Sequence, residues 1–394
     1  MSKAQLSRWT RISFGLILLA GFLGGSRWVF PLGYSNLIPW TSTIPDPETG
    51  NSTSKTGELR SNTAAVSRDN IEQVVERTRW PDETLTNPIP INSLAFSPDG
   101  SIITYGSNKS QIFLRQVSNG ALVDEIVGQP GAVDSLTFSP DGRLLASGIA
   151  KFVAANVWDD TVQIWRVSDR ALLQTMGGPR DAIAGCGIFR NSVAFSQDSA
   201  LIAAAGYDHT IRLWRVSEGT LLKTLEGHLL AVLSVAFSPD GKLLASASND
   251  DSVRIWQVSS GKLRHTLPKH LGGSTSIAFS PDGALLASGE ATGMVRLWRV
   301  TDGELVRTLE GDKNTVSNLV FSPDGALLVA GGNAAAGSIN IWNVADGVLL
   351  HTLAGHTGRV NNVAFSPNGE LIASGSVDGT VRLWGLAKAP LHQP

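Results

Sequence analysis

The sequence predicts an all-β fold in which seven small antiparallel sheets stack radially into a closed ring. The first observation behind this prediction is a repeat, because an apolar run ending in Phe-Ser-Pro-Asp-Gly or a near variant occurs seven times. Its phenylalanines are Phe96, Phe138, Phe195, Phe237, Phe279, Phe321 and Phe365. They lie 42, 57, 42, 42, 42 and 44 residues apart, so one unit is about 42 residues long. Two of the units therefore carry insertions, of 15 and of two residues.

A second marker, usually a tryptophan, follows the phenylalanine inside each unit. Wherever no insertion intervenes it comes 19 residues later, at Trp214, Trp256, Trp298 and Trp384. In the units with insertions the same role falls to Trp165 and Trp342, and in the first unit Arg115 replaces the tryptophan. Two markers at a constant spacing indicate seven copies of one structural unit.

The unit that begins at Ala231 divides into four short strands. AVLSVAF and LLASAS alternate or run apolar, VRIWQV alternates strictly, and KLRHTL closes the unit. We name these strands a, b, c and d in chain order. The Ser-Pro-Asp-Gly between a and b predicts a tight hairpin, because proline fixes φ and glycine tolerates a positive φ. Such a sheet has two apolar faces, and stacking seven of them radially covers both.

The last unit runs out of chain before its fourth strand. Only ten residues follow Trp384, which is too few to complete strand d. Because exposed sheet edges are a liability, we expect a strand from before residue 91 to take its place. Residues 71–80, IEQVVERTRW, stand where a closing strand is needed. A short helix is the alternative, since Ile71, Val74 and Val75 also fit helical spacing.

Composition excludes several classes of function. The 394 residues include 32 lysines and arginines against 34 acidic residues, so a chain that binds nucleic acid is not expected. The single cysteine, Cys186, excludes an internal disulfide and a multi-cysteine metal site. The sequence has no phosphate-binding glycine loop, no zinc-protease motif and no calcium-loop spacing. We therefore expect neither a metal nor another cofactor.

The N-terminal segment has the pattern of a membrane anchor. Lys3, Arg8 and Arg11 precede an uncharged apolar run over residues 12–25, and a tryptophan lies on each side of it. The basic residues should stay on the cytoplasmic side while the rest of the chain crosses. A cleaved signal peptide is the alternative, although no Ala-x-Ala follows the run.

The expected organisation has four parts. Residues 1–34 form the anchor or signal peptide, and residues 35–68, rich in Ser, Thr and Pro, form a flexible linker. Residues 69–386 form the ring of seven sheets, and residues 387–394 form a C-terminal tail. The ring is expected on the exported side of a membrane, held by one N-terminal segment. If the segment is cleaved, the protein is secreted or periplasmic.

Over about residues 70–386 the chain resembles the WD40-repeat family of seven-bladed β-propellers. The resemblance rests on the repeat length, on Phe-Ser-Pro-Asp-Gly and on the Val-Arg-Leu-Trp strand. The family's Gly-His dipeptide occurs at Gly227-His228 and Gly355-His356, whereas none of the marker tryptophans is followed by the aspartate of the family's Trp-Asp pair. The resemblance implies a propeller of four-stranded antiparallel blades, closed by an N-terminal strand, that binds other proteins.

Two units contain residues that mimic a Ser-His-Asp catalytic triad. These residues are His228, Ser246 and Asp250 in one unit and His356, Ser374 and Asp378 in the other. The resemblance implies instead that each set forms a structural hydrogen-bonded tetrad with the strand-c tryptophan, Trp256 or Trp384. Other units keep only part of the set, namely Asp159, Asp208, His270 and Ser288. Partial loss suits a redundant stabiliser better than a unique active site, so no enzyme activity is expected.

The irregular loops all fall on one face of the expected ring. The a-to-b and c-to-d turns are short and uniform, whereas the 15 inserted residues fall in a b-to-c loop and the following d-to-a loop. Recognition usually uses variable loops on a rigid scaffold, so the insertions suggest Phe152, Trp158 and Arg180 as partner contacts. The resemblance adds the residues that precede the aspartate of the b-to-c turn, namely Tyr207, Asn249 and Val377, and Asn108, which aligns with them although Lys109 follows it. Leu229 and Leu230, after His228, are either exposed contacts or loop packing.

These observations predict a non-catalytic, membrane-tethered or exported scaffold that binds a protein partner through the b-to-c and d-to-a loops. The alternative is a propeller that binds or hydrolyses a small molecule or polysaccharide in its central channel. A third class is a domain that assembles with copies of itself. Charged or histidine side chains lining the channel favour the second class, and an apolar irregular face favours the third.

Overall fold

The computed structural model describes residues 64–80, 88–128, 130–154, 157–177, 192–268, 270–311, 313–332 and 337–387. Within these residues every extended segment belongs to one of seven four-stranded antiparallel sheets. The predicted anchor over residues 1–34 lies outside the described part. In the part that is described, no helix has the length and apolar character needed to cross a membrane.

The strands repeat the expected order a, b, c, d along the chain. The a strands are β2 (Ile91–Phe96), β6 (Ala132–Phe138), β10 (Val193–Phe195), β14 (Val232–Phe237), β18 (Ser274–Phe279), β22 (Val316–Phe321) and β26 (Val360–Phe365). The b strands are β3 (Ile102–Ser107), β7 (Leu144–Ala154), β11 (Leu201–Ala205), β15 (Leu243–Ser248), β19 (Leu285–Glu290), β23 (Leu327–Gly332) and β27 (Leu371–Ser376).

The outer half of each sheet is made by strands c and d. The c strands are β4 (Gln111–Gln116), β8 (Val157–Arg166), β12 (Ile211–Arg215), β16 (Val253–Gln257), β20 (Val295–Arg299), β24 (Ile339–Asn343) and β28 (Val381–Leu386). The d strands are β5 (Leu122–Val127), β9 (Leu172–Gly177), β13 (Thr220–Leu225), β17 (Leu263–Leu267), β21 (Leu305–Leu309), β25 (Leu349–Leu353) and, for the last blade, β1 (Val74–Trp80).

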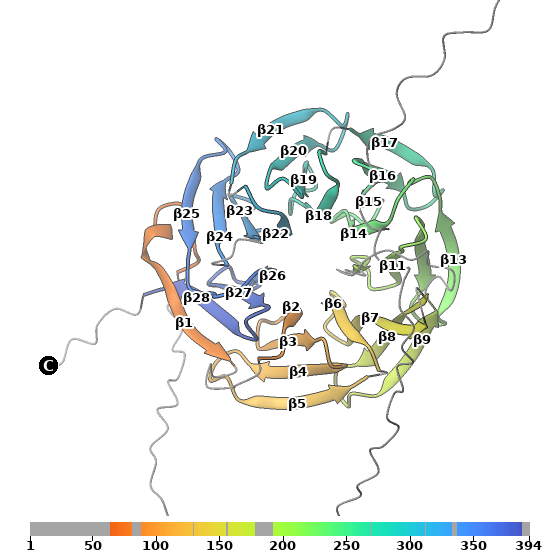
Figure 1. The fold of residues 1–394 in the computed structure, drawn as a ribbon, viewed down its shortest axis with the longest axis horizontal. Coiled ribbons are helices and arrows are strands. Elements are labelled where there is room, and N and C mark those ends of the chain that lie inside the picture. Colours follow the sequence, from red (N-terminus) through yellow and green to blue (C-terminus); the bar gives the residue numbers. More distant parts are fainter. Residues whose placement is uncertain are drawn as a thin grey trace, which may run out of the picture. The chain divides into compact units, whose positions relative to one another are not determined.

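The seven sheets are the blades of a propeller, numbered here 1 to 7 from β2 onward. Figure 1 shows the a strands around the centre and the d strands on the circumference. Successive a strands contact each other, and β26 of blade 7 contacts β2 of blade 1. The buried apolar side chains form clusters that each combine residues of adjacent blades, as radial stacking requires. The predicted seven-bladed fold is confirmed.

A repeated side chain ties each a strand to the next one. The residue three positions before the blade phenylalanine accepts a hydrogen bond from a main-chain N–H of the following blade, over 2.9–3.3 Å. These bonds join Ser93 to Leu136, Ser135 to Val193, Ser192 to Val235, Ser234 to Ile277, Ser276 to Leu319 and Asn318 to Val363. At the joint between blades 7 and 1, the side chain of Asn361 donates instead to the oxygen of Ile91, over 2.8 Å. We call this series the inner belt.

The a-to-b turns have the predicted tight geometry. In blade 4, Ser238 Oγ donates to Asp240 over 2.6 Å and accepts the N–H of Leu243 over 2.9 Å. The hydrogen bond from Ser238 is the main reason that the pKa of Asp240 lies below its ordinary value. Gly241 completes the turn at φ +69°, a conformation that favours glycine. Equivalent bonds recur in the other six blades.

The last blade takes its fourth strand from the N-terminal side of the propeller. β1 pairs antiparallel with β28, from Val74 opposite Leu386 to Trp80 opposite Val381 (Figure 1). The predicted closing strand is therefore confirmed, and the helix alternative holds only for Ile71–Gln73, which form one 3-10 turn before it. Arg382, only 3% exposed, donates to Glu76 across this pairing over 2.5 Å. The first and last strands of the propeller thus pair within the sheet of blade 7.

Trp80 fastens the closing strand to blade 1. Its indole lies so close to Gly120 that a Cβ placed there would be 2.3 Å from Trp80 Nε1. The guanidinium of Arg115 lies over the Trp80 ring at 6.0 Å and donates to Tyr105 Oη over 2.8 Å. Arg115 and Tyr105 thus occupy the places that a tryptophan and a serine or alanine take in other blades.

The first insertion differs from the expected loop. β7 and β8 simply continue past the length of other b and c strands, pairing from Leu144 opposite Arg166 to Ala154 opposite Val157. Asp159 was expected at a b-to-c turn, but it lies inside β8 opposite Lys151. The physical reason is that main-chain pairing continues along the inserted residues, which satisfies their N–H and C=O groups as a hairpin. The second insertion lies mainly outside the described residues.

Gly120 and Gly241 provide a matched test of the Trp80 contact. Both have positive φ, +73° and +69°, but a Cβ on Gly241 would meet nothing within 4 Å. Gly120→Ala should lower the free energy of unfolding by about 1–3 kcal/mol more than Gly241→Ala, because only the former overpacks a neighbour. Guanidinium unfolding of both variants measures the difference. Equal losses would show that Trp80 does not fasten the seam.

Candidate functional site

The b-to-c and d-to-a loops lie at the same end of every blade, because the strands of a blade are antiparallel. The four candidates before the turn aspartate fall on this loop face, in blades 1, 3, 4 and 7. Asn108 and Asn249 are exposed, and Tyr207 and Val377 are half-buried. Their blades are spread around the ring, so the structure does not gather all four into one cluster.

Two inserted candidates cannot be placed by their side chains. Phe152 and Trp158 lie opposite each other in the backbone pairing of β7 and β8, but their side chains fall outside the described atoms. Arg180 lies outside the described residues altogether. These three remain predictions from the sequence.

Exposed leucines mark one part of the loop face. Leu229 is 75% exposed, Leu230 is 48% exposed and Leu271 is 66% exposed. The first two lie between β13 and β14, and the third lies between β17 and β18, so they come from the d-to-a loops on either side of blade 4. The sequence pointed to the first two. Leu271 follows His270 as Leu229 follows His228, and this parallel could have revealed it.

The b-to-c turn of blade 4 holds both of these loops. Asp250 Oδ2 accepts the N–H of Leu229 over 2.9 Å, and Ser248 Oγ donates to the oxygen of Leu230 over 3.1 Å. On the other side, Asp251 Oδ1 accepts the N–H of Gly273 over 2.7 Å. The adjacent acidic residues thus each fix one loop, and the leucines project from fixed main chain. We call Leu229, Leu230 and Leu271 the leucine patch.

The tetrad of blade 4 supports this turn from below. Trp256 Nε1 donates to Ser246 Oγ over 2.8 Å, and Ser246 Oγ lies 2.7 Å from His228 Nε2. His228 Nδ1 lies 2.9 Å from Asp250 Oδ2, which places the proton on Nδ1 in the neutral ring. Ser246 then donates to Nε2. All four side chains are hydrogen-bonded, so the network is complete.

The tetrad cannot act as a catalytic triad in this arrangement. Ser246 is 0% exposed and His228 is 5% exposed, so no substrate carbonyl reaches the hydroxyl. The Trp256 N–H also occupies one side of the Ser246 oxygen. A nucleophilic serine needs an open approach and an oxyanion site.

Blade 7 repeats the whole arrangement. His356 lies 2.8 Å from Asp378 and 2.7 Å from Ser374, and Trp384 Nε1 donates to Ser374 over 2.8 Å. Hydrogen bonds from His356 and Thr380 outweigh burial and hold the pKa of Asp378 well below its ordinary value.

Blades 2 and 5 keep only part of the network. Trp165 Nε1 donates to Ser147 over 3.1 Å in blade 2. In blade 5, His270 lies 2.7 Å from Ser288, which also accepts from Trp298 over 2.8 Å. His270 is 0% exposed and its Nδ1 has no hydrogen-bond partner among the described residues. The missing aspartate therefore leaves a buried ring nitrogen without a partner.

Burial decides how these histidines titrate. It lowers the pKa of His228, although Asp250 acts in the opposite direction. Burial also lowers the pKa of His270, to about 4. For Asp250 burial acts to raise the pKa, but hydrogen bonds from Ser252, Leu229 and His228 outweigh it and bring the pKa to about 2. The neutral histidine and the ionised aspartate are therefore the folded forms at pH 7.

The central channel was the predicted alternative site. A recess of about 520 Å³ lies beside the innermost strands at the a-to-b turn end. Gln197, which replaces the proline of the a-to-b turn in blade 3, is one of the residues that line this recess. Its lining residues, none of them charged, are Phe195, Gln197, Ala236, Phe237, Ser238, Pro239, Ile277, Ala278, Phe279 and Pro281. Binding a polysaccharide calls for several convergent polar groups, so this lining does not favour that function.

Metal ligands do not gather in the described part of the chain. No group of three or more His, Cys, Asp or Glu side chains there is arranged to hold an ion. Cys186 lies outside the described residues.

Comparison with known proteins agrees with this architecture. Residues 190–334 match the family model described as the IFT122 first beta-propeller. Residues 120–166 and 347–385 match the model of the WD domain, G-beta repeat. No curated protein matches the chain. All three matched segments lie within the propeller. They end near the C-terminal ends of β8, β23 and β28.

His270 should make the fold sensitive to acid. A histidine whose pKa falls on folding stabilises fully above its unfolded pKa of about 6.5, and this stabilisation is lost as the pH falls through the folded value. Between pH 7 and pH 4.5 the loss attributable to His270 should be about 2–3 kcal/mol. Urea unfolding of the protein and of His270→Gln at both pH values measures it. The same pH dependence in both proteins would contradict this assignment.

Proposed function

Because WD40 repeats here close into a seven-bladed propeller, we propose that the protein is a non-catalytic scaffold that binds a protein partner through its loop face. The observation that carries the loop face as the binding surface is the leucine patch. Because an apolar face also suits self-association, the test of this patch distinguishes another protein from a second copy of the chain. Three leucines are 48–75% exposed on main chain that Asp250 and Asp251 hold in place. Exposed apolar side chains on a fixed surface are typical of protein interaction sites.

The partner surface extends outward from the leucine patch over the loop face. Asn249 is exposed in the turn between the two leucine loops, and Tyr207 is half-buried in the corresponding turn of blade 3. The sequence predicts three further partner contacts on this face, from the insertions in blade 2 and between blades 2 and 3. They are Phe152, Trp158 and Arg180. Asn108 and Val377, on blades 1 and 7, would contact only a partner that spans the ring. A complementary partner presents apolar side chains to the leucines and hydrogen-bonding groups to Asn249.

The proposal includes the site of action. Residues 1–34 hold the propeller at a membrane, with the propeller on the exported side, or direct it to a secreted or periplasmic location if they are cleaved. Support comes from the sequence alone, in the basic residues before an uncharged run of 14 residues.

Substitution of the leucine patch tests the binding face. The triple variant Leu229→Ser, Leu230→Ser, Leu271→Ser should reduce partner capture at least about ten-fold, because hot-spot residues each contribute about 1–2 kcal/mol. The measurement is affinity purification of the intact protein from solubilised membranes, quantified by mass spectrometry after cross-linking.

A matched control keeps this experiment specific. Leu221, Leu263 and Leu305 are 44–48% exposed on the circumference, and the same three substitutions there should leave capture unchanged. Equal loss in both variants would contradict the loop-face proposal. Loss of self-association in sedimentation, with no other protein cross-linked, would show that the patch binds a second copy instead.

Removal of residues 1–34 tests the proposed location. The intact protein should stay with membranes in alkaline carbonate, and its propeller should be digested by protease added from the exported side. The truncated protein should be soluble in the cytoplasm. Carbonate-resistant membrane binding by the truncated protein would contradict anchoring through this segment.

A further inference from the structure

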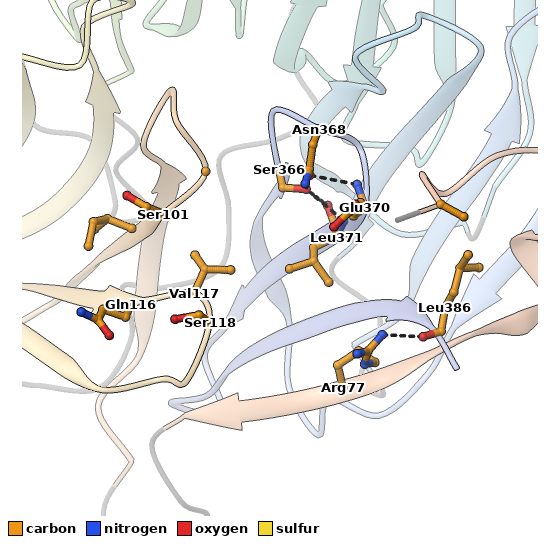
Figure 2. Close-up of a pocket in the computed structure, with 13 residues that line it drawn as sticks. Arg77, Ser101, Gln116, Val117, Ser118, Ser366, Asn368, Glu370, Leu371 and Leu386 are labelled. Atoms are coloured by element: carbon orange, nitrogen blue, oxygen red, sulfur yellow. Dashed lines mark hydrogen bonds between the residues drawn. The ribbon is translucent and has the colours of Figure 1, made fainter. Parts of the chain in front are cut away.

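A recess of about 380 Å³ lies at the seam where blade 7 meets blade 1 (Figure 2). It opens on the face of the a-to-b and c-to-d turns, away from the leucine patch. Figure 2 shows the c-to-d turn of blade 1, with Val117 and Ser118, on one side, and Glu370, Leu371 and Leu386 of blade 7 on the other. Arg77 of β1 borders it below. The seam is the one joint whose outer strand comes from the other end of the chain.

Three of the six other joints have a capping cation, whereas at the remaining three the register position of Lys223 holds Asp124, Gln174 or His351. At each of the first three joints, a cation on strand d donates to main-chain oxygens just after strand c of the next blade. Lys223 Nζ lies 3.1 Å from the oxygen of Val258 and also reaches that of Ser259. Two further bonds, of 3.1 and 3.0 Å, join Arg264 to Thr301 and Arg307 to Ala345. A basic side chain therefore caps the turn oxygens at these three joints.

At the seam, neither of the strand-d positions that hold these cations caps the turn of blade 1. Arg77 stands in the bulge position that Arg264 takes in blade 4, but it donates to the oxygen of Leu386 within its own blade. Thr78 stands in the register position of Lys223 and Arg307, since it pairs with Leu383 as they pair with Leu213 and Leu297. Its side chain is too short to cross to blade 1. In the described part of the chain, no side chain donates to the oxygens of Val117 or Ser118, which correspond to Val258 and Ser259.

Glu370 and Arg77 are the charged side chains that line the recess. The main-chain N–H of Glu370 donates to the side chain of Asn368. Among the described residues, the Glu370 carboxylate forms no ion pair. Arg77 is the cation that borders the same space, but its guanidinium donates to the oxygen of Leu386 over 2.6 Å. An aliphatic stem finds apolar contacts along Ile102, Val117, Leu371 and Leu386.

We propose that the seam recess binds a lysine or arginine side chain of a protein partner. The cationic head lies between Glu370 and the turn oxygens of Val117 and Ser118, and the stem lies on the apolar lining. Lys223 and Arg307 bind the equivalent turn oxygens within the chain, and Glu370 adds a carboxylate at the seam. The recess and the leucine patch are on opposite faces, so this site is independent of the proposed loop-face function.

A pair of small probes tests the charge requirement. Nα-acetyl-lysine methylamide and its norleucine counterpart have similar stems, but only the first carries an ammonium group. Saturation-transfer NMR titrations with the intact protein in detergent should show the lysine probe binding at least about ten-fold more tightly, as expected for a charge-assisted hydrogen bond. Equal affinity of the two probes would overturn the proposal.

Substitutions at the seam locate the binding. Thr78→Lys should supply the missing cap, raise the melting temperature and abolish binding of the lysine probe. Val75→Lys adds the same charge on the same strand at a side chain that is 44% exposed, and should do neither. Glu370→Gln should weaken binding about ten-fold while the melting temperature stays within a few degrees. Undiminished binding in Thr78→Lys or in Glu370→Gln would show that the probe binds elsewhere and would overturn the proposal.

Discussion

The pairing of β1 with β28 is the interaction on which the rest of the propeller depends. Each blade has two apolar faces, and both are covered only when the ring is closed. The closing pair joins segments about 300 residues apart, and it is reinforced by the ion pair of the buried Arg382 with Glu76 and by Trp80 against Gly120. Arg382 is buried and Glu76 is partly exposed, so removal of the Glu76 carboxylate takes a charged partner from a buried guanidinium.

Within the closed ring, the same few hydrogen bonds recur in successive blades. Blade 4 and the seam depart from this repeat, and each carries one of the proposed binding sites. The inner belt and the serine-aspartate turns repeat almost throughout. Blade 4 adds a complete tetrad, whose Asp250 also fixes the loop that carries Leu229. The same carboxylate therefore stabilises the blade and positions the binding surface. At the seam, Thr78 stands where Lys223 and Arg307 stand in two other blades, and a recess lies beside the uncapped turn of blade 1.

Periodicity in the sequence was sufficient to predict the blades, their four strands and the closing strand, since these depend on local pattern and on edge pairing. Other features depend on contacts between distant residues, which no pattern reports. The stacking of Arg115 on Trp80 is one example. The inserted hairpin was predicted as a loop because the length of a ladder depends on its partner strand. For Leu229 and Leu230 the sequence left exposure and loop packing open, and Leu271 was missed although it repeats the position of Leu229.

Native-state hydrogen exchange in the variant Glu76→Gln tests the dependence on closure most directly. Asp302→Asn, which removes a carboxylate from the exposed pair with Arg299, is the matched control. If closure makes the ring cooperative, Glu76→Gln lowers amide protection in the b strands of all seven blades by the same free energy, and the control leaves it unchanged. Loss of protection confined to blades 7 and 1 would contradict the account, because it would show that the other blades are stable without the seam.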